Sequence, residues 1–135
     1  AGGASTILEK TVAYTKERVQ FGKTIASYQA IKHKCADLLT QVESAKTLTY
    51  YAAWALSDAG SDSSDEASIA AAMAKSYATD AYKTCTAEAI QTHGAIGFTW
   101  EMPIHLYYKR ARANAVSIAT SNQLRDNLIQ KVAAA

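Results

Sequence analysis

The chain of 135 residues has little proline, glycine and cysteine, with one, six and two residues of these types. This scarcity excludes collagen-like, disulfide-rich and low-complexity disordered proteins. No window approaches the roughly 18 consecutive apolar residues of a membrane span, and the N-terminus lacks the basic-then-apolar order of a signal peptide. Cys35 and Cys85 have no second cysteine nearby. We therefore expect a soluble, non-secreted protein in a reducing, cytoplasmic compartment, with reduced thiols buried in its core.

The chain also has little excess of positive over negative charge, because 14 Lys and Arg against 12 Asp and Glu leave a formal net charge of +2. This excess is too small to indicate a polyanionic partner for the molecule as a whole. It is concentrated near the C-terminus, in Lys109, Arg110, Arg112, Arg125 and Lys131. A solvated helix face explains such a run, and a local anion site is the alternative.

The sequence is rich in alanine, at roughly one residue in five, and its apolar residues recur at helical spacing. The pattern predicts a first helix over residues 4–18 and a loop over 21–26. A second helix then runs from an N-cap at Ser27 to a C-cap at Gly60. Its expected inward stripe consists of Ile31, Cys35, Leu38, Leu39, Val42, Ala45, Leu48, Ala52 and Leu56.

Three further helices are predicted over residues 63–92, 103–116 and 120–132. Ser63 and Glu66 have the spacing of a capping box. Pro103 suits a first helical position, and Thr120 is a candidate N-cap.

Long helices joined by short links lie antiparallel to their neighbours in sequence. The predicted fold class is therefore all-α, an up-and-down four-helix bundle with a short additional C-terminal helix. We expect residues 1–135 to form one domain. The opening Ala-Gly-Gly has no convincing N-cap, which suggests a segment of a longer chain.

Metal and nucleophile chemistry lack their usual motifs. A di-iron bundle needs Glu-x-x-His pairs on facing helices, and none of His33, His93 and His105 has a glutamate three residues before it. The Gly-x-Ser-x-Gly elbow and the phosphate-cradling glycine loop are also absent. We therefore predict no metal site and no nucleophile triad.

Two segments nevertheless carry more chemistry than a plain bundle needs. In Glu17–Lys23, a helix end places an arginine, an aromatic residue and a glycine in one tight turn. In Gln91–Glu101, glycines let the backbone approach a ligand and expose N–H groups to anions. On spacing alone, a basic helix cap at Arg18 and a glycine-broken helix end at Gly94 remain the simpler interpretations.

Together the two segments, about seventy residues apart, resemble the C-terminal helical domain of the acyl-CoA dehydrogenases. Residues 18–22 (RVQFG) match the family's Arg-x-x-Phe-Gly, and residues 91–97 (QTHGAIG) match its Gln-x-x-Gly-Gly-x-Gly. The run at 28–31 matches the family's next helix start. Residues 101–103 and 109–110 also fall in the family's register, so the likeness covers nearly the whole chain.

This resemblance implies a flavoprotein that oxidises acyl-CoA thioesters to the α,β-enoyl form, with FAD as cofactor. It implies that Arg18 places its guanidinium on the FAD pyrophosphate of a neighbouring subunit, where a planar charged fork suits phosphate oxygens. Phe21 would pack on the adenine side of the cofactor, and Gln29 would hydrogen-bond it.

Five further cofactor contacts are implied by the resemblance. Gln91, with the backbone of Gly94 and Ala95, would hold the dinucleotide from the partner's side. Thr120 and Asn122 match family positions near the adenosine half of FAD, with Asn122 in place of the usual Gln or Glu.

Two further positions depart from the family pattern. Ala95 replaces the second glycine of the paired Gly-Gly, which a small side chain can tolerate. The family's best-known catalytic base is a Glu just before Gly-Thr, and here Ile118 precedes Ala119 and Thr120. We therefore assign no catalytic residue to this chain. Some relatives carry the Glu upstream on the helix that opens this domain, and others are non-catalytic halves of heteromeric enzymes.

The resemblance predicts a C-terminal domain that contributes a cross-subunit FAD clamp and an oligomer interface, homomeric or heteromeric, and is inactive alone. Acyl-CoA would be the substrate of the full-length enzyme and an electron-transfer flavoprotein its electron acceptor. Three alternatives stay open: a non-catalytic structural subunit, a small acyl-CoA-binding bundle, and a nucleic-acid-binding protein that uses Lys109, Arg110 and Arg112.

Overall fold

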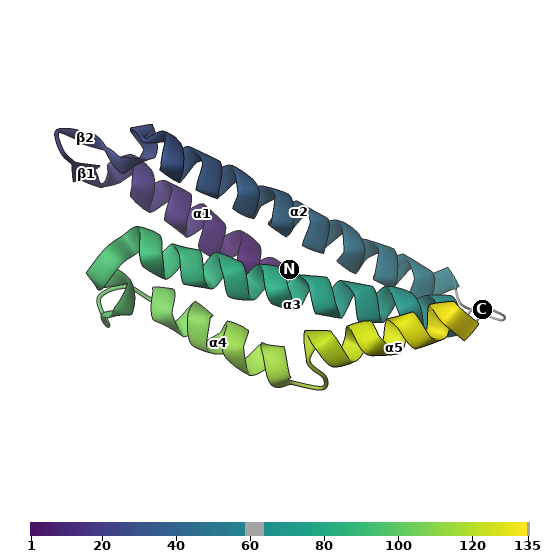
Figure 1. Cartoon of the computed structure of the whole chain (residues 1–135). Coiled ribbons are helices and arrows are strands. Elements are labelled where there is room, and N and C mark those ends of the chain that lie inside the picture. The colour runs from purple at the N-terminus through teal and green to yellow at the C-terminus, as the bar shows by residue number, and fades with distance from the viewer. Residues whose placement is uncertain (59–63, 135) are drawn as a thin grey trace.

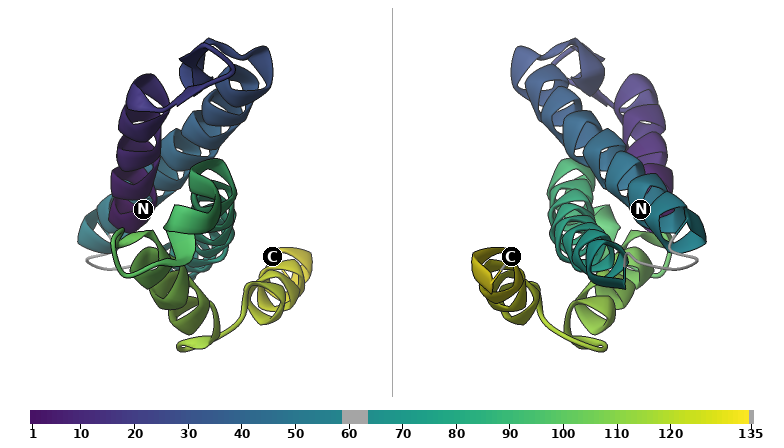
Figure 2. Two further views of the ribbon diagram at one scale, coloured as in Figure 1. Left: turned by 90° about the vertical axis from the view of Figure 1, so that its left-hand side faces the viewer. Right: turned by 90° about the vertical axis from the view of Figure 1, so that its right-hand side faces the viewer.

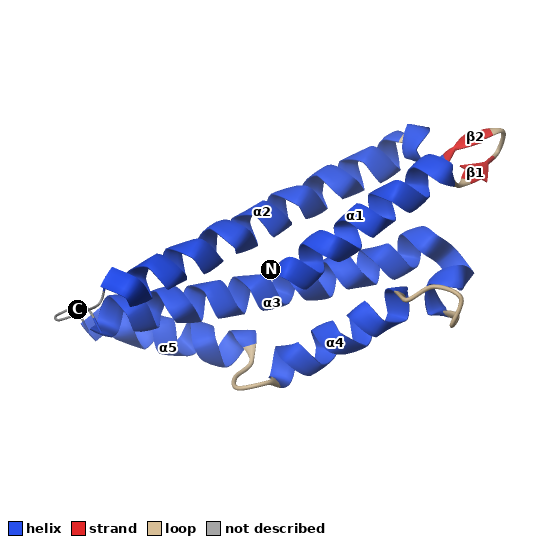
Figure 3. Ribbon diagram, turned by 180° about the vertical axis from the view of Figure 1, so that it is seen from behind, coloured by secondary structure: helices blue, strands red, loops and turns tan. Residues whose placement is uncertain are grey.

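A computed structural model describes residues 1–58 and 64–134 of the chain. In these residues almost all of the structure is α-helical, which confirms the predicted all-α class (Figure 3). None of the described helices is long and apolar enough to cross a bilayer. The elements, in chain order, are α1 (Gly2–Glu17), β1 (Val19–Gln20), β2 (Lys23–Thr24), the 3-10 helix η1 (Ile25–Ser27), α2 (Gln29–Asp58), α3 (Ser64–His93), the 3-10 helix η2 (Gly94–Phe98), α4 (Ile104–Val116) and α5 (Ser121–Ala134).

The helix α3 lies at the centre of the molecule and packs against all four other α-helices (Figures 1 and 2). The first four helices alternate in direction, as predicted for an up-and-down bundle (Figure 1). This arrangement places the end of α1, the start of α2, the end of α3 and the start of α4 at one end of the bundle (Figure 1).

The last helix agrees with the predicted short additional C-terminal helix. α5 has 14 residues and α4 has 13, so both are short beside α2 and α3, which have 30 residues each. Both run antiparallel to α3, because the chain does not reverse at the link between them (Figure 1). The α5 end of the pair reaches the first turns of α3, where Lys131 Nζ donates to Ser68 Oγ at 2.9 Å. α4 and α5 therefore lie one after the other along α3, in the place that a single fourth helix of the bundle would take.

The main core lies where α1, α2, α3 and α4 meet. Ile7, Val42 and Ile104 are almost completely buried there, and Cys85 and Ile90 of α3 pack in the same cluster. A second cluster further along α2 and α3 is made of small residues, which let the two helices approach closely; it consists of Ala52, Ala55, Ala70 and Ala74.

The two cysteines differ in burial. Cys85 is a core residue, as predicted, and burial raises the pKa of its thiol to about 11. Cys35 is only half-buried, at a groove between α1 and α2. Burial also raises the pKa of Cys35, although the charge of Lys34 opposes the shift. Both thiols are therefore protonated at neutral pH.

The predicted inward stripe of α2 is wrong at two leucines. Leu39 and Leu56 are 51% and 62% exposed, whereas the residues directly before them, Leu38 and Ala55, are buried. Successive residues on an α-helix point about 100° apart, so a residue next to an inward one faces solvent.

The predicted N-cap at Ser27 is also wrong. Ser27 ends η1, and its Oγ donates to the Thr24 carbonyl at 2.7 Å instead of capping α2. α2 begins two residues later, and the Tyr28 carbonyl accepts its first bonds from the N–H groups of Ile31 and Lys32. The extra turn of 3-10 helix takes up the residues that the cap prediction assigned to α2.

Other helix ends agree more closely with the sequence signals. The predicted N-cap Thr120 is confirmed, because its N–H donates to Gln123 Oε1 at 3.0 Å while its Oγ1 accepts from the Gln123 N–H at 3.4 Å. Pro103 stands one residue before α4 instead of within it. The predicted caps Gly60 and Ser63 lie outside the described residues.

Candidate functional site

Arg18 and Phe21 are presented by a β-hairpin, where the sequence predicted a loop. Arg18 ends α1 with an extended backbone, φ −69° and ψ 121°, which turns the chain into β1. β1 and β2 pair antiparallel and are joined by Phe21 and Gly22 alone. The Arg18 side chain is exposed, and it forms no ion pair with any residue in the described ranges. Its guanidinium is therefore available to an external anion.

The backbone at Phe21 is strained. Phe21 and Gly22 both have positive φ, 53° and 79°, which is the signature of a type I′ turn. Glycine adopts this conformation freely. For a residue with a Cβ, the same conformation costs roughly 1–2 kcal/mol of conformational free energy. The Phe21 side chain is 92% exposed, so contacts within the described chain offset little of that cost. Strain retained at an exposed aromatic residue is typical of binding sites.

Tyr28 fixes the hairpin to the start of α2. Its hydroxyl donates to the Gln20 carbonyl at 3.1 Å, and Lys23 Nζ lies 4.3 Å from the centre of its ring. Gln29, the first residue of α2, is exposed beside this contact. Gln29 is therefore held at the same end of the bundle as Arg18.

The second predicted segment forms the last turn of α3 and the start of η2. Gln91 is exposed, and Gly94 has a φ of 67°, with nothing within 4 Å of where a Cβ would lie. Gly94 is thus required by the backbone conformation, and its face is open to a ligand, as is the exposed Ala95. Gly97 is different: it is buried, and a Cβ there would meet the Ile90 carbonyl oxygen at 3.1 Å, so this glycine serves packing.

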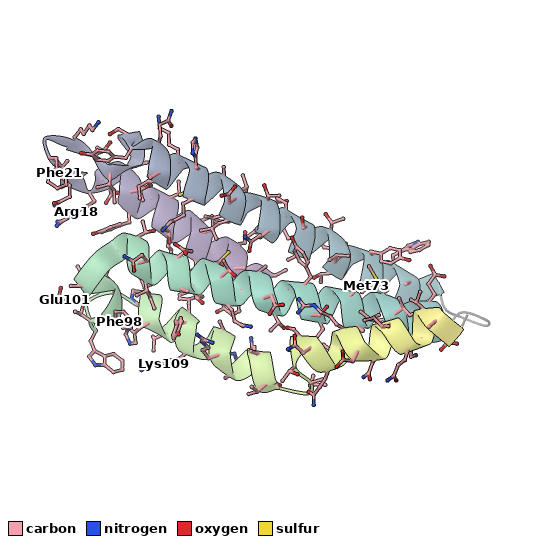
Figure 4. All side chains as sticks on the ribbon, viewed as in Figure 1. Arg18, Phe21, Met73, Phe98, Glu101 and Lys109 are labelled. Carbon is pink, nitrogen blue, oxygen red and sulfur yellow. The ribbon has the colours of Figure 1, made fainter. Side chains whose placement is uncertain are left out.

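The structure brings these two segments to the same end of the bundle. Figure 4 shows Arg18 and Phe21 on the hairpin at the end where Phe98 and Glu101 follow α3. Tyr14 connects the two sides: its ring stacks on His93 with centroids 4.1 Å apart, and its hydroxyl donates to the His93 carbonyl at 3.4 Å. The helix that carries Arg18 is therefore tied to the helix that carries Gln91.

His93 makes this connection sensitive to pH. The side chain is buried, and burial lowers its pKa below the ordinary value of 6.5, although its Nδ1–H donates to the Ala89 carbonyl at 2.7 Å, which opposes the shift. Protons then bind the unfolded chain more readily than the folded one below about pH 6.5. The contribution of His93 to stability is thus complete above that pH and is lost as the pH falls towards the folded-state pKa.

We expect the free energy of unfolding to decrease between about pH 7.5 and about pH 5, and His93→Phe to reduce that decrease while it keeps a ring against Tyr14. Urea unfolding at the two pH values measures the effect. His33 is exposed, so His33→Gln is the matched control. An equal pH dependence in His93→Phe and the unchanged chain would contradict this role.

Thr120 and Asn122 lie elsewhere, at the junction of α4 and α5. They face a cavity of about 550 Å³ whose lining is Asp80, Lys83, Thr84, Arg112, Ala115, Val116, Thr120, Ser121, Asn122 and Arg125. Ser121 is hydrogen-bonded to Asp80 of α3, and Gln91 stands eleven residues further along that helix. At 1.5 Å per residue the two regions are about 16 Å apart along α3. The predicted site residues therefore lie in two separate regions of the molecule.

Ile118, at the family's base position, lies in the link just before this junction. Its side chain is 95% exposed and its φ is 75°, an outlier for a β-branched residue. It has no ionisable group, so it cannot take a proton. The described residues also contain no group of three or more His, Cys, Asp or Glu side chains able to hold a metal ion.

Sequence reasoning missed the residues that hold these turns in place. Tyr14, Asp80 and Arg125 carry no local motif, and their partners are 41 to 79 residues away along the chain. The only signal for Asp80 was an isolated acid in an alanine-rich helix. Their roles depend on which helices meet, which the sequence pattern leaves open.

Comparison with known proteins identifies the family. The model of the acyl-CoA dehydrogenase C-terminal domain matches residues 1–133. The chain belongs to this family. The acyl-CoA dehydrogenase IpdE2 of Mycolicibacterium smegmatis is 44% identical over 115 residues, 84% of this chain and 33% of the relative.

Two further relatives show the same partial match. The caffeyl-CoA reductase–Etf complex subunit CarC of Acetobacterium woodii is 39% identical over 120 residues, 89% of this chain and 30% of that protein. The crystal structure of an FAD-dependent dehydrogenase superposes with a TM-score of 0.88 and 29% identity over 97% of this chain and 34% of that one. The chain thus spans about a third of the length of these relatives, and it is an acyl-CoA dehydrogenase C-terminal domain.

Proposed function

We propose that this domain helps to hold FAD in an acyl-CoA dehydrogenase, as a clamp that reaches across a subunit interface. The observation that carries the proposal is the position of Arg18, which is exposed at one end of the bundle (Figure 4). The helix α3 ends there too, at the open backbone of Gly94. A guanidinium suits the oxygens of a pyrophosphate, and a residue without a Cβ lets a ligand approach the backbone closely. The relative described as an FAD-dependent dehydrogenase supports FAD as the ligand.

The donor set at this end fits a dinucleotide. Arg18 supplies a permanent charge for phosphate, and the exposed Phe21 ring supplies a face on which adenine can stack. Gln29 and Gln91 are exposed amides that can hydrogen-bond the remaining polar groups. These groups point away from their own core, which suits a cofactor held by a partner subunit.

Thr120 and Asn122 form the second contact region, which we assign to the adenosine half of FAD. Asn122 is exposed at the first turn of α5, where free backbone N–H groups favour polar and anionic ligands. Asn122 has a shorter side chain than the Gln or Glu usual at this position, so its contact reaches less far into the site.

Bound FAD would supply the acceptor for the hydride removed from the β-carbon of the acyl thioester. The α-proton needs a separate base, and Ile118 cannot provide one. We propose that the base lies on a segment outside this chain. The same isoleucine favours a second candidate function, a non-catalytic subunit that holds FAD for a partner.

Anaerobic addition of an acyl-CoA to the whole protein separates the two functions. Loss of flavin colour indicates a complete active site, and unchanged colour with retained FAD indicates a non-catalytic subunit. The name of the Acetobacterium relative, a subunit of an Etf complex, supports an electron-transfer flavoprotein as electron acceptor for the assembled enzyme. We also propose that the domain assembles as a homo- or hetero-oligomer, because the clamp needs a partner subunit.

Phe21→Asn tests the binding role independently of folding. Asparagine tolerates positive φ, so the hairpin should be unchanged or more stable by up to about 1 kcal/mol. FAD binding should weaken about tenfold, because stacking of a base on an aromatic ring contributes about 1–3 kcal/mol. Flavin fluorescence titration of the FAD-free whole protein and urea unfolding measure the two effects.

The matched control for Phe21→Asn is Tyr50→Gln, which removes an aromatic ring that is 73% exposed on α2. That change should leave FAD affinity unchanged. If both variants bind FAD as tightly as the unchanged protein, the Phe21 ring does not contact the cofactor.

A further inference from the structure

Asp80 lies on the face of α3 that meets the first turn of α5. Its carboxylate accepts from Ser121 Oγ at 3.0 Å and from Lys83 Nζ at 3.0 Å, and it is ion-paired with the guanidinium of Arg125. Ser121 is buried, and its hydroxyl also lies 3.3 Å from the Ser76 carbonyl oxygen. Two consecutive turns of α5 are therefore tied to a single carboxylate.

The turn that needs this support directly flanks the predicted cofactor contacts. Ser121 stands between Thr120 and Asn122, so any shift of its backbone moves both. The preceding link holds Ile118 in a left-handed conformation that a β-branched residue adopts at a cost. The start of α5 is thus set by contacts with α3 more than by the preference of the link itself.

The charge state of Asp80 suits this role. Burial is the largest single effect and raises its pKa, but the hydrogen bonds from Lys83, Arg125 and Ser121 outweigh it and lower the pKa below the ordinary 3.8. Asp80 is therefore ionised at neutral pH. It balances one of the cationic groups at the cavity and holds Arg125 at a fixed position beside Asn122, whose Oδ1 accepts from the Arg125 guanidinium at 3.4 Å.

We propose that Asp80 is a positioning residue, which sets the start of α5 so that Thr120 and Asn122 meet the cofactor. This role rests on the proposed FAD contact at the α4–α5 junction. Asp80 does not itself need to touch the cofactor, since its carboxylate is already occupied by three donors from this chain.

The chain provides a matched control at the other end of the same helix pair. Lys131 of α5 lies 3.4 Å from the Asp65 carboxylate of α3, and the Asp65 side chain is 88% exposed. Asp65→Asn thus removes a second, more exposed α3–α5 ion pair, far from Thr120. If Asp80 acted only on stability, Asp80→Asn would lower the free energy of unfolding without changing the Kd of the folded protein for FAD.

The test is a flavin fluorescence titration of the FAD-free whole protein carrying Asp80→Asn, Asp65→Asn or Asn122→Ala. We expect Asp80→Asn to raise the Kd for FAD at least tenfold and Asp65→Asn to change it less than twofold. If Asp80→Asn does not fold, Ser121→Ala removes one bond of the same contact and should raise the Kd in the same direction. Asp80→Glu keeps the charge and should recover part of the affinity.

Two results overturn the proposal and remain distinguishable. If Asn122→Ala weakens FAD binding but Asp80→Asn and Ser121→Ala do not, the positioning role is wrong and the FAD contact stands. If none of the three changes the Kd, the FAD contact at the junction is itself wrong, and the role of Asp80 is wrong with it.

Discussion

Arg18→Ala should weaken FAD binding about tenfold to a hundredfold and leave the fold unchanged. Arg18 is exposed, it ends α1 without an ion pair to any described residue, and removing it leaves no buried group unsatisfied. A hydrogen bond between charged groups is worth about 1.5–3 kcal/mol, which corresponds to this range of affinity. Flavin fluorescence titration gives the affinity, and circular dichroism verifies the helical content.

Two variants sharpen this result. Arg18→Lys keeps the charge but loses the planar fork of the guanidinium. Its affinity for FAD should therefore lie between those of the unchanged protein and Arg18→Ala. Lys16→Ala removes an exposed cation from the last turn of the same helix and should bind FAD normally. If Arg18→Ala and Lys16→Ala retain FAD equally, the assignment of the pyrophosphate to Arg18 is wrong.

Ile7→Ala should lower the free energy of unfolding by about 2–5 kcal/mol. Ile7 is fully buried in the main core, and truncation leaves a cavity that the neighbouring helices fill only in part. The size of the loss reports how firmly α1, and with it Arg18, is held against α3. Urea unfolding of the chain measures it, provided that the slope of the transition is unchanged.

The control for Ile7→Ala is Ile129→Ala, the same substitution at a side chain that is 68% exposed on α5. It should change the free energy of unfolding by no more than about 0.5 kcal/mol. A loss of similar size at both positions would show that the core does not lie where α1 meets α3.

Much of the fold follows from local signals in the sequence. Helical periodicity, the N-cap at Thr120 and the glycine at the end of α3 give the helices and their order. The hairpin was missed because its turn is Phe21-Gly22, and phenylalanine is not a residue that the type I′ conformation usually selects. Local signals leave the direction of α5 open, because it depends on contacts with α3.

The residues of the candidate site also divide into those that short motifs predict and those that depend on long-range contacts. The Arg18 and Gln91 segments were found because each is a short motif, and both lie at one end of the bundle (Figure 4). Asp80 was not found, since a single acid on an alanine-rich helix gives no indication that it will meet Ser121, 41 residues later. Long-range partners of this kind emerge only when the helices are packed.

The most direct test of the central claim is a structure of the whole protein with FAD bound. We predict that the guanidinium of Arg18 lies within hydrogen-bond distance of the pyrophosphate of an FAD bound mainly by the neighbouring subunit, with Gln91 and the Gly94 backbone on the same cofactor. An FAD whose pyrophosphate is held without Arg18, or an Arg18 side chain still exposed to solvent in the loaded protein, would contradict the claim.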